Sequence, residues 1–81
     1  MADIIEYVTD VTALRKRMID FNINSISELE RQSGISRPTL TNILNGKEQP
    51  SSRAMYCLAV CLRMSPTEAG CIFFKPILRS T

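Results

Sequence analysis

The 81-residue sequence contains no histidine, no tryptophan and only three cysteines. Without histidine, it lacks the base that usually activates a cysteine nucleophile, and it lacks a common zinc ligand. Cys57 and Cys61 have a spacing that suits two zinc ligands, but Cys71 is the only other thiol. We therefore interpret the cysteines as small core residues. We expect no catalytic residue, no metal and no cofactor, and hence no enzyme.

Long apolar runs and a basic leader are also absent. The longest apolar run, 54–62, is far shorter than the ~20 residues that a membrane-spanning helix needs. The first residues, MADIIEYV, lack the basic start of a signal peptide. Unpaired thiols are typical of a reducing compartment. The sequence therefore predicts a cytoplasmic protein that is not attached to a membrane.

Length and charge suggest one small domain with a locally basic face. A chain of this size buries only about 60 % of its unfolded surface, so we expect a single domain with a modest core. The net charge of +2 is mild, but it is unevenly distributed. Residues 1–14 carry three acidic residues and no basic one, whereas the basic residues gather in the middle of the chain. A basic face of this kind suits nucleic acid.

The segment 26–46, ISELERQSGISRPTLTNILNG, has the pattern of a helix-turn-helix. Two short amphipathic segments, 26–33 and 37–45, flank a corner that begins at Gly34. A residue just past a helix end often adopts a left-handed conformation that glycine takes at little cost. Ser36 is predicted to cap the second helix. Five apolar residues fall on the inner faces of the two helices: Leu29, Ile35, Leu40, Ile43 and Leu44.

Capping signals predict the other helices. Asp10 or Thr12 can cap a first helix, whose apolar stripe is Val11, Leu14, Met18 and Phe21. Ser25 is predicted to cap the first motif helix. A fourth helix over 52–64 is apolar nearly all round and needs partners on both sides. Ser65 begins a capping box for a short fifth helix ending near Gly70. The predicted fold is all-α, a compact bundle of about five short helices.

The sequence leaves the secondary structure of the two ends of the chain open. The lead-in 1–10 suits either a short helix or an extended segment. In the tail 71–81, Pro76 excludes a central strand, so the tail is an edge strand, a short helix or an ordered tail. Its apolar residues either fold back on the fourth helix or pack against a second copy, and we favour the second copy. The dimer-interface candidates are Phe73, Phe74, Ile77 and Leu78.

The stretch 29–47, LERQSGISRPTLTNILNGK, resembles the lambda-repressor-like DNA-binding domains of the phage Cro and repressor group. It has the leucine, the turn glycine, the paired apolar residues and the closing Asn-Gly of that family. The resemblance extends over roughly 13–69. Glu30 stands where the family usually has alanine, and Ser33 where it usually has a mid-sized apolar residue.

This resemblance implies that the second motif helix reads DNA in the major groove and that flanking residues hold the phosphates. The base-reading candidates are Arg37, Pro38, Thr41 and Asn42. The phosphate candidates are Ser25, Ile26, Ser27, Ser36, Thr39, Asn45, Lys47 and Arg53.

Several of these residues have a plainer alternative. Arg37 can instead pair with Glu30 or remain solvated. Asn45 can be simply the stop of a helix. The basic triplet 15–17 is either a solvated face or a phosphate contact.

We expect a sequence-specific transcriptional regulator that binds a palindromic double-stranded operator as a homodimer. One alternative is the antitoxin of a toxin–antitoxin pair, in which an end segment holds a toxin partner. The other is a protein-interaction module that has lost DNA binding.

Overall fold

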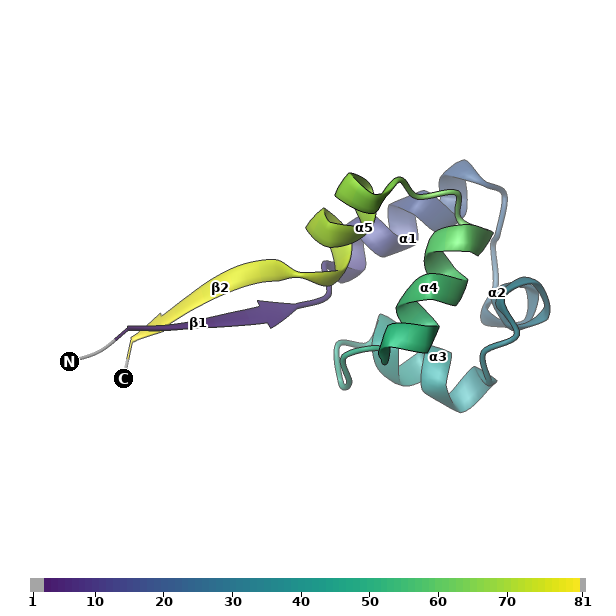
Figure 1. Cartoon of the computed structure of the whole chain (residues 1–81). Helices are drawn as coiled ribbons and strands as arrows, with labels where there is room; N and C mark the ends of the chain where they lie inside the picture. Colours follow the sequence, from purple (N-terminus) through teal and green to yellow (C-terminus); the bar gives the residue numbers. More distant parts are fainter. Residues whose placement is uncertain (1–2, 81) are drawn as a thin grey trace.

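The structure, a computed structural model, describes residues 3–80, with side chains for residues 6–77. Within this span, five helices lie between an N-terminal and a C-terminal strand (Figure 1). The elements are β1 (Asp3–Val8), α1 (Val11–Asp20), α2 (Ile26–Ser33), α3 (Arg37–Leu44), α4 (Ser52–Cys61), α5 (Pro66–Phe73) and β2 (Lys75–Ser80). The predicted bundle of about five short helices with a central helix-turn-helix is confirmed, and a small two-stranded sheet is added to it.

Three of the predicted caps form as the sequence indicates. The carboxylate of Asp10 accepts the N–H of Ala13 at 3.1 Å, so Asp10, not Thr12, begins α1. The hydroxyl of Ser25 accepts the N–H of Glu28 at 3.1 Å and begins α2. At α5, Ser65 forms the full reciprocal capping box. Each cap satisfies a backbone N–H that has no partner inside its helix.

The last two helices differ in length from the prediction. Helix α4 ends at Cys61 instead of continuing to Met64, and Arg63 has a left-handed φ of 52°. Helix α5 continues past Gly70 to Phe73. A helical glycine costs only about 1 kcal/mol relative to alanine, which the burial of Ile72 and Phe73 outweighs.

The core draws on all five helices, together with residues just outside their ends. Its buried apolar residues are Leu14, Met18, Ile23, Leu29, Leu40, Ile43, Leu44, Ala54, Leu58, Leu62, Ile72 and Phe73. The exposed face of α4 differs from the expectation of partners on both sides. Its Tyr56 and Val60 are 71% and 60% exposed.

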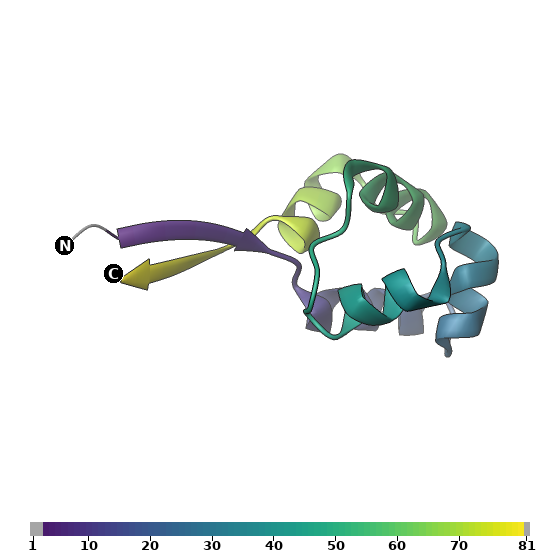
Figure 2. The ribbon, with the colours of Figure 1, turned by 90° about the horizontal axis from the view of Figure 1, so that it is seen from below.

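The two strands form an antiparallel arm that projects from the helices (Figures 1 and 2). The register runs from Asp3 opposite Ser80 to Val8 opposite Lys75. The extended alternative therefore holds for the lead-in, and the edge-strand alternative holds for the tail. Pro76 is tolerated because each strand of a two-stranded sheet is an edge strand. The arm gives the molecule its elongated extents of 46 × 25 × 20 Å.

One side chain, Gln49, holds both roots of the arm. Its carbonyl oxygen accepts the hydroxyl of Thr9 at 2.9 Å, just after β1. Its amide nitrogen donates to the carbonyl of Phe73 at 2.6 Å, just before β2. The N–H of Asp10 also donates to the carbonyl of Ile72 at 2.6 Å. The arm is thus fixed to the loop between α3 and α4 and to the end of α5.

The apolar tail residues have different fates. Phe73 is 1% exposed and belongs to the core of its own chain, so for Phe73 the fold-back alternative holds. Phe74 is 49% exposed, and its ring makes an edge contact with Tyr7 at a centroid distance of 6.4 Å. Ile77 is half-buried. Leu78 lies opposite Ile5 in the register, and its side chain lies outside the described residues.

Candidate nucleic-acid interface

The turn between α2 and α3 places one face of α3 at the surface. Gly34 ends α2 with a φ of 76°, the left-handed conformation that its position predicts. The inner face of α3 is buried through Leu40, Ile43 and Leu44. Arg37 and Pro38 are exposed at the N-terminal end of α3, while Thr39, Thr41 and Asn42 are half-buried.

Arg37 is held in place by two residues of α2. Its Nη2 donates to Oγ of Ser27 at 2.7 Å and lies 3.8 Å from Oε1 of Glu30. The pairing with Glu30 that the sequence offered as an alternative is therefore present. The Arg37 side chain is nevertheless 58% exposed, so its guanidinium is still accessible from outside.

The start of α3 is capped differently from the prediction. The hydroxyl of Ser36 donates to Oγ1 of Thr39 at 2.9 Å and makes no capping hydrogen bond. Instead, Oε2 of Glu30 accepts the N–H of Arg37 at 2.9 Å. A carboxylate at this position also complements the positive end of the helix dipole.

Asn42 organises the loop that follows α3. Its Nδ2 donates to Oε1 of Glu48 at 3.1 Å. Its carbonyl accepts the N–H groups of Lys47 and Glu48 at 2.8 and 3.3 Å. To read a base, the Asn42 amide would have to exchange its contact with Glu48 for one with DNA.

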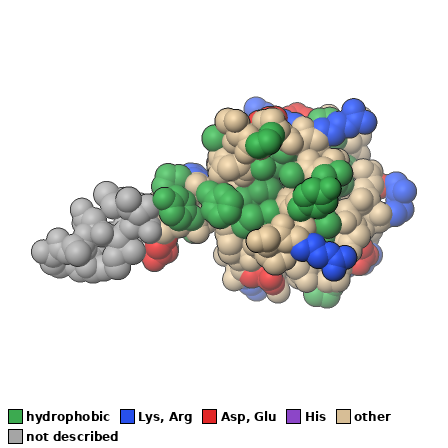
Figure 3. Space-filling view, viewed as in Figure 1, with side chains coloured by type: hydrophobic (Ala, Val, Ile, Leu, Met, Phe, Trp, Pro, Cys, Tyr) green, Lys and Arg blue, Asp and Glu red, His purple; other side chains and the backbone are tan. Residues whose placement is uncertain are grey.

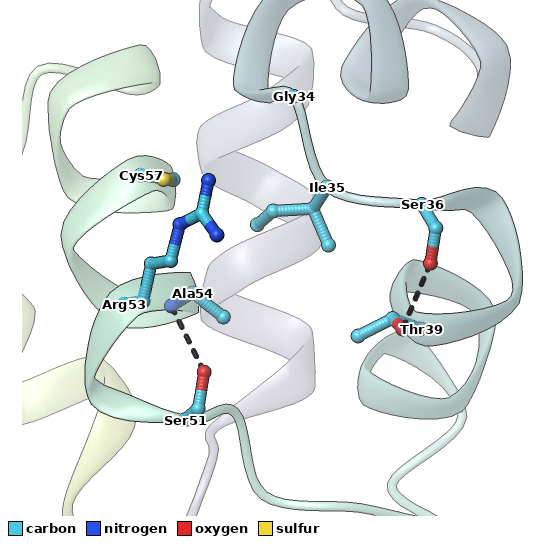
Figure 4. A pocket seen from close by; sticks show the side chains of 8 residues that line it. All are labelled: Gly34, Ile35, Ser36, Thr39, Ser51, Arg53, Ala54 and Cys57. Carbon is cyan, nitrogen blue, oxygen red and sulfur yellow. Dashed lines mark hydrogen bonds between the residues drawn. The ribbon is translucent and has the colours of Figure 1, made fainter.

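Three phosphate candidates share one open hollow beside the turn (Figure 4). The hollow has a volume of ≈ 220 Å³ and is lined by Gly34, Ile35, Ser36, Thr39, Ser51, Arg53, Ala54 and Cys57. Arg53 extends from α4 towards Ile35, and the hydroxyls of Ser36 and Thr39 lie on the α3 side. Hydroxyl groups and a guanidinium are typical phosphate ligands.

Ser51 is a member of this hollow that the sequence reasoning missed. Ser51 directly precedes the predicted fourth helix, and a serine immediately before a helix is a recognisable capping signal. Its hydroxyl accepts the N–H of Ala54 at 3.2 Å and so begins α4.

The remaining phosphate candidates lie on either side of α3. At the start of α2, Ser25, Ile26 and Ser27 stand where free N–H groups favour an anion. Glu28, one residue further, bonds to Arg31 and Gln32. The hydrogen bond from Gln32, followed by the bond and charge of Arg31, keeps the pKa of Glu28 below its usual value.

Beyond the C-terminal end of α3, Lys47 is exposed. Asn45 is the C-terminal cap of α3, which fits the plainer alternative for this residue.

Two arginines of the basic triplet in α1 bond to other elements of the fold. Arg15 donates to the carbonyl of Leu44 at 2.9 Å, at the C-terminal end of α3. Arg17 donates to the carbonyls of Leu62 and Arg63 at 2.9 and 2.6 Å and pairs with Glu68. Basic side chains near helix ends complement the negative end of the dipole. The sequence carried no signal for these long-range partners.

The cysteines are less buried than core residues, so their predicted place in the core is wrong for Cys71 and only partly met by Cys57 and Cys61. Cys57 lines the hollow and Cys61 packs against the core, and both are partly buried, while Cys71 is exposed. Burial, together with the neighbouring Cys57 and Glu28, raises the pKa of the Cys61 thiol. Within residues 3–80, no helix is both long and apolar enough to cross a bilayer.

A family model for the Cro/C1-type helix-turn-helix DNA-binding domain matches residues 13–69, which is more than half of the chain. The chain belongs to the Cro/C1-type family of helix-turn-helix DNA-binding domains. The expected resemblance is thus confirmed, and this Cro/C1-type domain is a DNA-binding regulator domain. Curated proteins and solved structures gave no match. The matched residues include most of α1, all of α2 to α4 and the start of α5, and they exclude both strands of the arm.

Proposed function

We propose that this Cro/C1-type domain is a sequence-specific transcriptional regulator of the phage repressor or Cro kind. In this proposal the whole chain acts as one domain and inserts α3 into the major groove of its operator. The observation that carries the proposal is the exposed Arg37 guanidinium at the N-terminal end of α3, next to the hollow that contains Arg53.

Arg37 and the hollow have separate tasks. The fork of Arg37 can donate two hydrogen bonds to O6 and N7 of guanine, a contact worth about 1–3 kcal/mol of discrimination. Arg53 and the hydroxyls around it supply contacts to a phosphate, which fix the position of α3 but do not read sequence. Lys47 and the start of α2 extend these phosphate contacts to the two sides of α3.

The proposal includes a homodimer on a palindromic operator. A two-stranded sheet is marginally stable by itself, and a further strand or a packed partner stabilises it. Near the root of the arm, Tyr7 and Phe74 are exposed. Figure 3 shows apolar side chains gathered at this root. In such a dimer, the two copies of α3 would bind half-sites about 34 Å apart.

A selection from random duplexes tests the regulator proposal. We expect the wild-type chain to enrich one palindromic sequence at moderate salt. Arg37→Ala should abolish the preference at one guanine of each half-site while leaving the rest of the sequence enriched, because only one base contact is lost.

Lys16→Ala is the control for the loss of one positive charge, since Lys16 is exposed on α1 and does not belong to α3. It should leave the enriched sequence unchanged. A wild-type chain that enriches no sequence would refute the proposal.

A further inference from the structure

Glu30 contacts both the backbone and the side chain of Arg37. Its Oε2 accepts the backbone N–H of Arg37 at 2.9 Å, and its Oε1 lies 3.8 Å from Nη2 of that residue. The side chain of Glu30 is 40% exposed, so the carboxylate lies near the surface that α3 presents. Ser27 adds the second anchor, because its Oγ accepts a hydrogen bond from Nη2 at 2.7 Å.

We propose that Glu30 is a positioning residue that makes Arg37 selective for a base instead of a phosphate. This inference rests on the proposed function. Nη2 of Arg37 carries two N–H groups, of which one donates to Ser27, and the same nitrogen faces Glu30. Its other N–H and the adjacent N–H of Nε or Nη1 form the fork that can donate to a base edge.

The negative charge has a second effect. An arginine that can move freely binds any phosphate, and this contact strengthens binding to every sequence equally. A carboxylate beside Arg37 repels nearby phosphates, whereas a guanine edge carries no net charge. Glu30 therefore weakens binding to unrelated DNA more than it weakens binding to the operator.

Glu30→Gln separates the charge from the helix cap, because the amide oxygen can still accept the N–H of Arg37. Binding of the full chain to the selected operator and to a scrambled duplex is measured across a range of salt concentrations. We expect the ratio of operator to scrambled affinity to fall about fivefold, mainly through tighter binding to the scrambled duplex. The salt slope for the scrambled duplex should steepen by about 0.9, the value for one additional phosphate contact.

Glu28→Gln is the matched control. It removes the same charge from the same helix, but Glu28 contacts Arg31 and Gln32 instead of Arg37. We expect its affinity ratio to equal that of the wild type. In an Arg37→Ala background, Glu30→Gln should no longer change the ratio, because its effect passes through Arg37.

Ser27→Ala provides a test without a change in charge. It removes the hydrogen bond to Nη2 and should also lower the affinity ratio. Circular dichroism checks that each variant keeps its helices.

The outcomes separate the two proposals. If the wild-type chain selects an operator but Glu30→Gln behaves like Glu28→Gln, the positioning role is refuted and the regulator proposal stands. If the wild-type chain selects no sequence, both are refuted.

Discussion

Single side chains in this molecule hold separate elements together through backbone carbonyls. Arg17 of α1 reaches Leu62 and Arg63, just past the end of α4, and its guanidinium lies 5.1 Å from the ring centroid of Phe21. Gln49 similarly bonds the carbonyl of Phe73 at the end of α5. The last carbonyls of a helix have no partner inside it, so such bonds satisfy them. These residues are therefore structural, although their polar side chains suggest a solvated surface.

At the same scale, Phe73 and Phe74 are neighbours with opposite environments, which makes them a matched pair. Phe73→Ala should lower the free energy of unfolding by about 3–5 kcal/mol, because it leaves a cavity in the core. Phe74→Ala should cost much less, since its ring is 49% exposed. Urea denaturation followed by circular dichroism measures both. Equal costs for the two variants would contradict the assignment of Phe73 to the core.

Helix α5 begins with a full reciprocal capping box. Ser65 and Glu68 bond reciprocally, and Glu68 also pairs with Arg17 of α1. The hydrogen bond from the backbone N–H of Ser65 is the largest cause that holds the pKa of Glu68 below its ordinary value of 4.5, and Arg17 adds to it. The carboxylate of Glu68 thus connects the cap of α5 to Arg17 of α1.

This arrangement predicts a pH dependence of stability. Since the pKa of Glu68 is lower in the folded than in the unfolded chain, its contribution is fully present above about pH 4.5 and is lost as the pH falls. Thermal unfolding of the wild type and Glu68→Gln is compared from pH 7 to pH 3. The stability difference between them should shrink below about pH 4.5. A difference that stays constant with pH would exclude this role for the carboxylate.

The elements themselves differ in how well they could be predicted. Local signals were sufficient for the start of α2 at Ser25 and for its end at Gly34, because caps and left-handed glycines depend on adjacent residues. The cap of α3 was not predictable in this way, since Glu30 replaced Ser36 across the turn. The pairing of Asp3 with Ser80 was also inaccessible, because it joins residues at opposite ends of the described chain.

In the candidate site, too, features set by neighbouring residues were predictable and features set by distant residues were not. The exposure of Arg37 was predictable from its position on an amphipathic helix. The contribution of Ser51 to the hollow was missed, because the approach of α4 to the turn depends on core packing and not on neighbouring residues.

At the scale of the whole molecule, large apolar side chains are exposed at the end of α1, with Ile19 and Phe21, and in two further regions of the described residues. One is the root of the arm, with Tyr7 and Phe74, and the other is the face of α4, with Tyr56 and Val60. Figure 3 shows apolar side chains in both regions. Our dimer proposal uses the arm, because an uncovered two-stranded sheet has the greater need of a partner.

Sedimentation at micromolar concentration tests that choice. The wild type should sediment as a species of twice the 9.1 kDa chain mass. Tyr7→Ser should weaken the dimer, since it places a hydroxyl where an aromatic ring would be covered. Tyr56→Ser is the matched control on α4 and should leave the dimer intact. A 9.1 kDa wild-type species would refute the dimer, and sensitivity only to Tyr56→Ser would move the interface to α4.

The pairing of β1 with β2 also has a consequence for synthesis on the ribosome. Residues of β1 are translated first, yet their partners in β2 are translated after all five helices. Closing so long a loop is costly before the helices bring its ends together. The nascent strand DIIEYV must therefore emerge with its backbone unpaired, and an unpaired apolar strand edge can associate with other chains. Pairing with β2 covers one edge of β1 and so ends the interval in which both of its edges are open.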